Sequence, residues 1–160
     1  MKKTAVIPGS FDPITVGHLS LVLRASEVFD KVVLHVCNNF DKEYLFTKEE
    51  RLEIAKSALR GLDGVSVAAH DSWLYEYLLT HKDSVLVKGV RNEKDLEYEK
   101  NMAQFNFEKS GVETLFFMSD DSLSSVSSTD VRERIVQGVE WEKFVPQNAQ
   151  KIVEKFYAEK

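Results

Sequence analysis

Five short apolar segments alternate along this chain with longer stretches of helical periodicity, and this alternation restricts the fold more than any other feature. The segments are rich in β-branched residues and are bounded by turn-forming residues, which is typical of buried strands. They occupy residues 4–8, 31–37, 65–69, 84–90 and 114–118. Strands that are apolar on both faces and alternate with helices predict a parallel sheet that is covered on both sides.

The intervening stretches show the spacing of amphipathic helices. Thr47 with Glu50, and Ser127 with Asp130, have the spacing of a capping box at a helix start. Helices are expected over 17–29, 47–62, 72–82, 93–109, 127–138 and 148–160. The predicted fold is therefore a Rossmann-like α/β sandwich of three layers, with a five-stranded parallel sheet and helices on both faces. Because no repeat or linker interrupts the pattern, we expect one domain over 1–160.

The overall charge excludes several classes of function. A chain of 160 residues with a net charge of −5 has no global field that would attract nucleic acid or anionic lipid. Its single cysteine, Cys37, excludes an internal disulfide and a cysteine-built zinc site. His35, His70 and His81 lack metal-binding spacing, so they are expected to be structural and no protein metal ligand is expected. With no signal peptide or membrane span in the pattern, the expected location is cytoplasmic.

The loops that follow the five expected strands hold more polar groups than turns require. In a parallel sheet, ligands bind in the crevice beyond the carboxyl ends of the strands. The loops there read PGSFDPITVGH, NNFDKEYLF, HDSWL, KGVRNEKD and SDDSLSSVSST. Cations, hydroxyls or histidines gather in four of these five loops. Their convergence predicts a binding site for an anionic ligand.

The first loop has the composition of a phosphate site. Gly9 and Gly17 permit close backbone approach and positive φ, while two prolines direct the path between them. His18 stands at the start of the following helix, where free N–H groups and the helix dipole suit an anion. By itself His18 is better explained as an ordinary helix-start residue, and only the composition of the whole loop favours a phosphate site.

Cations and hydroxyls in three other loops could reach the same crevice. Lys88 and Arg91 flank the end of the fourth strand, and Lys42 lies in the loop after the second. Together they could neutralise a polyphosphate. Lys42 could equally be a surface lysine, and the serines of SSVSST a plain helix cap. Motifs for a P-loop, a dinucleotide fingerprint, a nucleophile elbow and a zinc protease are all missing from the sequence.

Two motifs resemble those of the nucleotidylyltransferase superfamily. GSFDPITVGH is similar to its T/H-x-G-H signature, with Thr15, Gly17 and His18 at the fixed positions, and SSVSST is similar to its hydroxyl-rich second motif. YLFTKEERLEIAK, VLVKGVRNEKDLEYE and the chain length resemble, more specifically, the bacterial phosphopantetheine adenylyltransferase family. This resemblance extends over essentially the whole chain.

The resemblance implies transfer of AMP from ATP to 4′-phosphopantetheine, which gives dephospho-coenzyme A and pyrophosphate in coenzyme A biosynthesis. It implies that His18, Lys42 and Arg91 act in catalysis. It further implies Mg²⁺ bound through the ATP phosphates, a homohexamer, and coenzyme A as a candidate feedback inhibitor.

The resemblance also implies which residues of this chain bind each substrate. For phosphopantetheine the resemblance implies Ser10, Lys42, Leu74 and Lys88. For ATP it implies Ser10, Phe11, His18, Gly89, Val90, Arg91, Glu99, Leu123, Ser124, Ser125, Val126, Ser127, Ser128 and Thr129.

The chain departs from the family pattern at four of these positions, where threonine usually stands at 10, arginine at 88, tryptophan at 123 and serine at 129. Each replacement keeps the hydroxyl, charge or apolar character, so activity is expected to survive, although the contacts of Lys88 and Leu123 are open. Two alternatives remain at this point. One is another nucleotidylyltransferase, acting on nicotinate mononucleotide or using CTP, and the other is a non-catalytic nucleotide sensor.

Overall fold

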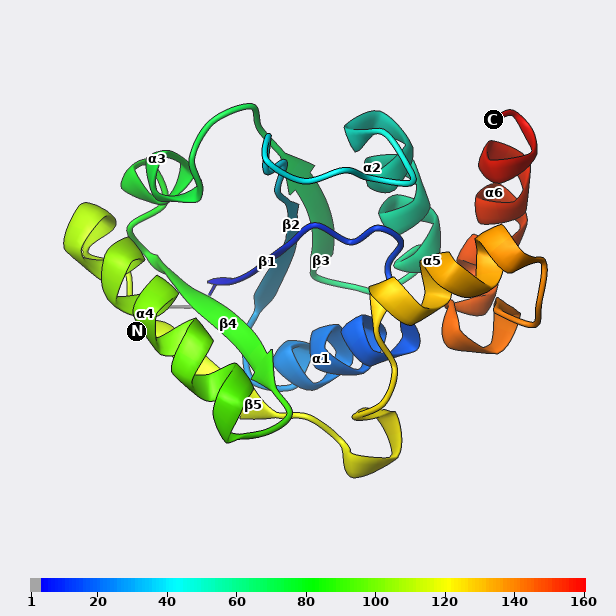
Figure 1. Cartoon of the computed structure of the whole chain (residues 1–160). Coiled ribbons are helices and arrows are strands. Elements are labelled where there is room, and N and C mark those ends of the chain that lie inside the picture. The colour runs from blue at the N-terminus through cyan, green and yellow to red at the C-terminus, as the bar shows by residue number, and fades with distance from the viewer. Residues whose placement is uncertain (1–3) are drawn as a thin grey trace.

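The computed structural model describes residues 4–160, which form a five-stranded sheet with helices packed around it (Figure 1). The strands are β1 (Thr4–Gly9), β2 (Lys31–Val36), β3 (Val65–Ala69), β4 (Ser84–Val90) and β5 (Thr114–Met118). Their order in the sheet is β3-β2-β1-β4-β5, and every neighbouring pair is parallel. This confirms the predicted α/β fold with its parallel sheet.

The helices begin and end close to the expected positions. They are α1 (Val16–Ser26), α2 (Lys48–Ala58), α3 (Leu74–Leu79), α4 (Glu93–Ser110), α5 (Ser128–Gln137) and α6 (Gln147–Ala158), with short 3₁₀ turns at Asp121–Leu123 and Glu142–Phe144. The α3 helix is shorter than the predicted 72–82, because no side chain caps its start at Trp73 and the chain turns after Thr80. None of the helices described over residues 4–160 is long and apolar enough to cross a membrane.

Alternate residues of each central strand pack on opposite faces of the sheet. Ala5 and Ile7 of β1 belong to the larger core, which α1, α2, α5 and α6 cover. Val6 of β1 and Leu86 of β4 belong to a smaller core with Leu78 of α3. Figure 1 shows α3 and α4 on this second side. Both faces of the sheet are thus covered, as strands without polar alternation require.

The strand order determines where a ligand can bind. From β1 the chain builds outward through β2 to β3, and then returns to place β4 on the other side of β1 and β5 beyond it. The loops after β1 and β4 therefore leave the sheet in opposite directions and open a crevice between them. Both loops were singled out in the sequence for their phosphate-binding composition.

Candidate active site

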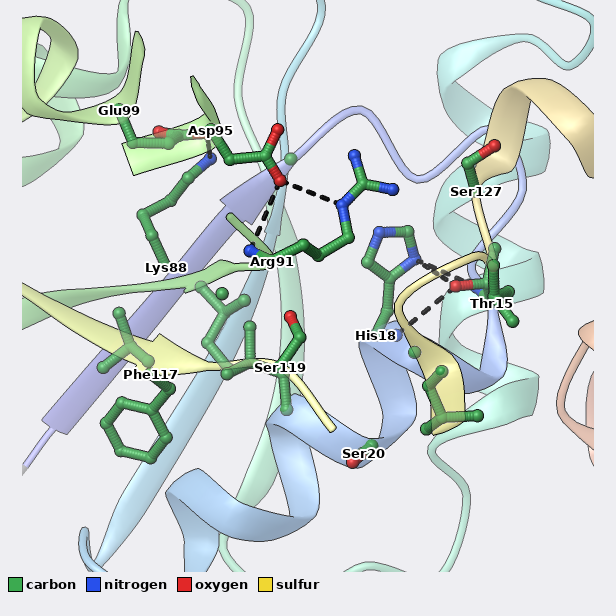
Figure 2. Close-up of a pocket in the computed structure, with 18 of the residues that line it drawn as sticks. Thr15, His18, Ser20, Lys88, Arg91, Asp95, Glu99, Phe117, Ser119 and Ser127 are labelled. Atoms are coloured by element: carbon green, nitrogen blue, oxygen red, sulfur yellow. Dashed lines mark hydrogen bonds and ion pairs between the residues drawn. The ribbon is translucent and has the colours of Figure 1, made fainter. Parts of the chain in front are cut away.

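A cavity of about 610 Å³ lies at the carboxyl ends of β1 and β4 (Figure 2). The starts of three helices face it, through His18 of α1, Asp95 of α4 and Ser128 of α5. Their N-terminal dipoles favour a polyanion. Of the residues predicted to bind ligand, the lining contains Phe11, His18, Lys88, Gly89, Arg91, Glu99, Leu123, Val126, Ser127 and Ser128.

The T-x-G-H sequence forms a capping box in which histidine takes the place usually held by glutamate. The Thr15 side chain accepts a hydrogen bond from the His18 backbone N at 3.4 Å. The Thr15 backbone N donates in return to His18 Nδ1 at 3.0 Å. Because Nδ1 is an acceptor, the proton of the neutral ring must reside on Nε2. The cap thus selects the tautomer and leaves Nε2–H as a donor.

The imidazole of His18 is kept uncharged by its surroundings. Burial, and next the positive charges of Lys88 and Arg91, together lower its pKa from 6.5 to about 4. The ring of Phe11 meets it edge to face, with 4.9 Å between centroids. His18 is therefore a neutral hydrogen-bond donor at physiological pH.

The backbone of the first loop differs from the expectation in one respect. Neither Gly9 nor Gly17 has positive φ, and the left-handed residue is Phe11, with φ 49°. The need for glycine at position 9 is steric, since a Cβ there would lie 2.9 Å from Cζ of the Phe11 ring. The turn therefore uses glycine to admit an aromatic ring and not to reverse the backbone.

Two cations of the cavity wall are paired with carboxylates of α4 (Figure 2). Lys88 Nζ lies 3.2 Å from Glu99 Oε1, and Arg91 Nε lies 2.9 Å from Asp95 Oδ2. Arg91 also donates through Nη1 to the backbone O of Ser124 at 3.4 Å. These pairs hold both cations at the cavity, so an incoming anion would have to compete with the carboxylates or bind beside them.

The hydroxyl-rich segment connects α5 to the first loop. Ser127 is the N-cap of α5, and its hydroxyl accepts from the Asp130 backbone N at 3.1 Å. Ser128 Oγ donates to the Pro13 backbone O at 2.9 Å. This segment thus caps α5, which was one of the two interpretations of SSVSST. It also places the start of α5 at the cavity.

Seven predicted ligand residues lie outside the cavity lining: Ser10, Lys42, Leu74, Val90, Ser124, Ser125 and Thr129. Ser10 directly follows Gly9 of the lining. Lys42 is exposed in the loop between β2 and α2, and Leu74 begins α3. Lys42 and Leu74 follow the strands on the β2–β3 side, so their proposed ligand would have to extend beyond the cavity.

Sequence reasoning missed the far wall of the cavity. Arg24 donates to the Met118 backbone O at 2.6 Å and lies over the Phe117 ring, with 5.5 Å from Cζ to the centroid. The lining also contains Ser20, Leu21, Lys94, Tyr98, Ser119 and Asp120. A signal for part of this wall was present, because His18, Leu21 and Arg24 recur every three residues along one side of α1.

A buried histidine lies away from the cavity, in the middle of a ring cluster. His35 of β2 is fully buried, with its ring centroid 4.7 Å from that of His70 and 4.5 Å from that of Tyr77. Burial, and next the neighbouring His70, lower the pKa of His35 to about 4. These contacts agree with the structural role expected for both histidines.

The lowered pKa of His35 predicts how stability changes with pH. The unfolded chain takes up a proton near the ordinary value of 6.5, whereas the folded chain resists it until about 4. Stability is therefore complete above pH 6.5 and falls as pH decreases toward 4. Between pH 7.5 and 5 we expect His35 to account for a loss of about 2 kcal/mol. Urea unfolding of wild type and His35→Leu at both pH values measures this, and equal losses in the two proteins would refute it.

Comparison with known proteins agrees with the geometry. Residues 6–134 match the cytidylyltransferase-like family. A phosphopantetheine adenylyltransferase of Symbiobacterium thermophilum is 44% identical over 154 residues, which are 95% of each chain. The chain belongs to the phosphopantetheine adenylyltransferase family. The family member of Thermotoga neapolitana is 41% identical over 155 residues, covering 94% of this chain and 95% of its own. That of Thermobifida fusca is 35% identical over 157 residues, covering 98% and 96%.

Membership of the phosphopantetheine adenylyltransferase family confirms the resemblance drawn from the T-x-G-H loop and the later motifs. It makes the chain an enzyme of the nucleotidyltransferase class. The cavity between the T-x-G-H loop and the start of α4 is therefore the candidate active site for nucleotide transfer.

Proposed function

We propose that this chain transfers AMP from ATP to 4′-phosphopantetheine and so produces dephospho-coenzyme A and pyrophosphate. The observation that supports this most is the neutral His18, whose Nε2–H is free to donate in a cavity that also contains Lys88 and Arg91. A neutral donor beside two cations suits a phosphoryl centre on which negative charge develops.

The reaction needs no protein nucleophile. A phosphate oxygen of phosphopantetheine forms a bond to the α-phosphorus of ATP, and the bond from that phosphorus to the bridging oxygen of the leaving pyrophosphate breaks. The attacking group is already an anion, so no general base is required. The work of the protein is to position two polyanions and to stabilise the charge of the transition state.

The proposed roles follow the arrangement of the cavity. His18 Nε2–H donates to the phosphate oxygens of the transition state, and Arg91, held by Asp95, neutralises the ATP phosphates. The helix start at Ser127 and Ser128, with Phe11, Gly89, Glu99 and their neighbours, binds ATP. On the other side, Ser10, Lys42, Leu74 and Lys88 bind phosphopantetheine. In the structure Lys88 pairs with Glu99, so Lys88 would contact both Glu99 and the phosphate of phosphopantetheine.

Magnesium is proposed to arrive bound to ATP. Over the described residues 4–160, no group of three or more His, Cys, Asp or Glu side chains is placed to hold a metal ion. In the cavity wall, Asp95 and Glu99 already pair with cations. Phosphate oxygens are the hard ligands that Mg²⁺ prefers, and the ion would supply charge neutralisation on the phosphates.

Assembly and regulation are proposed from the family. Large apolar side chains are exposed along α4 and β5, among them Leu96, Tyr98, Met102, Phe105 and Met118. Such a surface supports self-association, for which we propose a homohexamer. Coenzyme A shares most of its structure with the proposed product, which supports feedback inhibition at the same site. A cytoplasmic location is proposed because the substrates are biosynthetic intermediates.

A substrate comparison tests the function. Pyrophosphate release from ATP is measured with phosphopantetheine, and then with nicotinate mononucleotide in its place or CTP in place of ATP. We expect turnover only with the ATP and phosphopantetheine pair. Turnover with either substitute would assign another nucleotidylyltransferase activity. Nucleotide binding without any release would assign a sensor.

Lys88 provides a specific test of the phosphopantetheine side. Lysine offers one compact charge, whereas arginine can grip a phosphate through two parallel hydrogen bonds. Lys88→Arg should therefore keep activity, with KM for phosphopantetheine equal or lower. Lys88→Met removes the charge and should raise that KM about tenfold or more, which is about 1.4 kcal/mol. Steady-state kinetics decides between them, and a methionine variant with wild-type KM would place residue 88 outside the binding site.

A further inference from the structure

Arg51 of α2 is a fully buried arginine that contacts two functional loops at once. Its Nη1 donates to the backbone O of Ser10 at 2.7 Å and to that of Cys37 at 2.9 Å. Its Nη2 donates to Asn38 Oδ1 at 2.6 Å, and Nε donates to the Phe46 backbone O at 3.2 Å. One guanidinium thus connects the loop after β1 to both ends of the loop between β2 and α2.

The same guanidinium organises the interior of the second loop. The ring of Tyr44 lies 4.0 Å from Arg51 Cζ, as a cation–π contact requires. The Tyr44 hydroxyl accepts from the Asn39 backbone N at 2.8 Å, and the Asn39 backbone O accepts from the Lys42 backbone N at 3.1 Å. A continuous path of contacts therefore runs from Arg51 to Lys42.

Packing alone does not account for this arginine. All four of its hydrogen bonds go to uncharged oxygens, and the carboxylates of Asp12 and Glu49 interact with its charge electrostatically without accepting any of these bonds. Burying a charge is costly, and the four hydrogen bonds that offset this cost all go to the two loops. The two loops are also connected independently, because the Asp12 carboxylate accepts from the backbone N of Leu45 and of Phe46, both at 2.9 Å.

We propose that Arg51 is a positioning residue for the phosphopantetheine side of the reaction. It holds Ser10 and the loop that contains Lys42 in one fixed arrangement, and it acts through them because it does not line the cavity. This inference rests on the proposed function.

Other contacts hold the ATP side of the site. His18 is oriented by Thr15, and Arg91 by Asp95, and the four hydrogen bonds of Arg51 go to other residues. Although Ser10 is also expected to contact ATP, loss of the Arg51 contacts should therefore lower the use of phosphopantetheine far more than the affinity for ATP. A residue needed only for folding would not separate the two substrates in this way.

The substitution Arg51→Lys keeps the positive charge. The compact ammonium group of lysine, however, cannot donate to all four acceptors of the planar guanidinium. We expect kcat/KM for phosphopantetheine to fall about 30-fold, while Kd for a non-hydrolysable ATP analogue, measured by calorimetry, changes less than about threefold. Arg134→Lys is the matched control, because Arg134 also donates to a backbone O, that of Glu140, and lies over a ring, that of Phe144. The control should leave both parameters unchanged.

A double-mutant cycle with Lys42→Ala tests whether Arg51 acts through Lys42. If it does, Lys42→Ala should cost about tenfold less in kcat when Arg51 is already lysine than in wild type. Fully additive effects, or wild-type kcat/KM in Arg51→Lys, would overturn the inference.

Asn38→Ala covers the case in which Arg51→Lys does not fold, since it removes one acceptor of the guanidinium and leaves the arginine in place. We expect a smaller loss, about fivefold in kcat/KM for phosphopantetheine, again with ATP affinity kept. An unchanged kcat/KM in that variant would overturn the inference. If the wild-type protein does not convert phosphopantetheine at all, the proposed function is overturned instead. Failure of the Arg51 inference and failure of the proposed function are therefore distinguishable.

Discussion

Replacement of His18 by alanine should lower kcat about 10²–10³-fold, the usual loss when one donor to a transition state is removed. The reason is the geometry of the cap. Thr15 N donates to Nδ1 at 3.0 Å, so the ring presents Nε2–H to the cavity, and alanine has no donor to replace it. Affinity for ATP should change far less, because the donor acts where charge develops during the reaction. Steady-state kinetics and calorimetric binding measure the two effects separately.

The His18 variant also loses half of a capping box, so its stability needs a matched control. Glu50→Ala removes the corresponding side chain from the capping box of α2. Each variant should lose about 1 kcal/mol of unfolding free energy, and only the His18 variant should lose turnover. A His18→Ala enzyme that keeps more than about half of wild-type kcat would make His18 a structural cap and exclude the proposed mechanism.

Replacement of Lys42 by alanine should lower kcat about 100-fold, because this cation is proposed to orient the attacking phosphate. In the structure Lys42 is exposed and its backbone N contacts Asn39 O. Its side chain should therefore contribute little to folding, and unfolding free energy should stay within about 0.5 kcal/mol of wild type. A large kinetic effect with unchanged stability is the combination that a ligand contact produces.

Lys56→Ala is the control for the Lys42 variant, because Lys56 is an exposed lysine of α2 outside the cavity lining. It should match wild type in both kinetics and stability. If Lys42→Ala behaves like Lys56→Ala, with normal kcat/KM for phosphopantetheine, Lys42 is an ordinary surface lysine and its assignment is wrong.

Local sequence was sufficient to predict the elements of the fold. The β-branched segments predicted each strand to within one residue at either end. Strand preference, helical periodicity and capping depend on neighbours a few residues apart, so these features can be read along the chain. Alternation of strands and helices then implied a parallel sheet and a crevice at its carboxyl edge. The T-x-G-H loop, Lys88 and Arg91 were identified in the same way, as polar groups near the carboxyl ends of strands.

The chemistry of the site depends on contacts between distant segments, and those became visible only in the folded chain. The low pKa of His18 comes first from its burial and then from Lys88 and Arg91, which the β1–β4 pairing brings beside it. The pairing of Lys88 with Glu99 and the far wall at Arg24 and Phe117 likewise depend on packing. Arg51 is the strongest case, because its spacing from Ile54 and Ala58 indicates the buried side of α2, whereas its Ser10 partner is 41 residues away and cannot be read from the local sequence. The spacing of apolar residues shows which side of a helix or strand is buried. The partners of a buried charged side chain, in contrast, depend on which distant segments the fold brings to it.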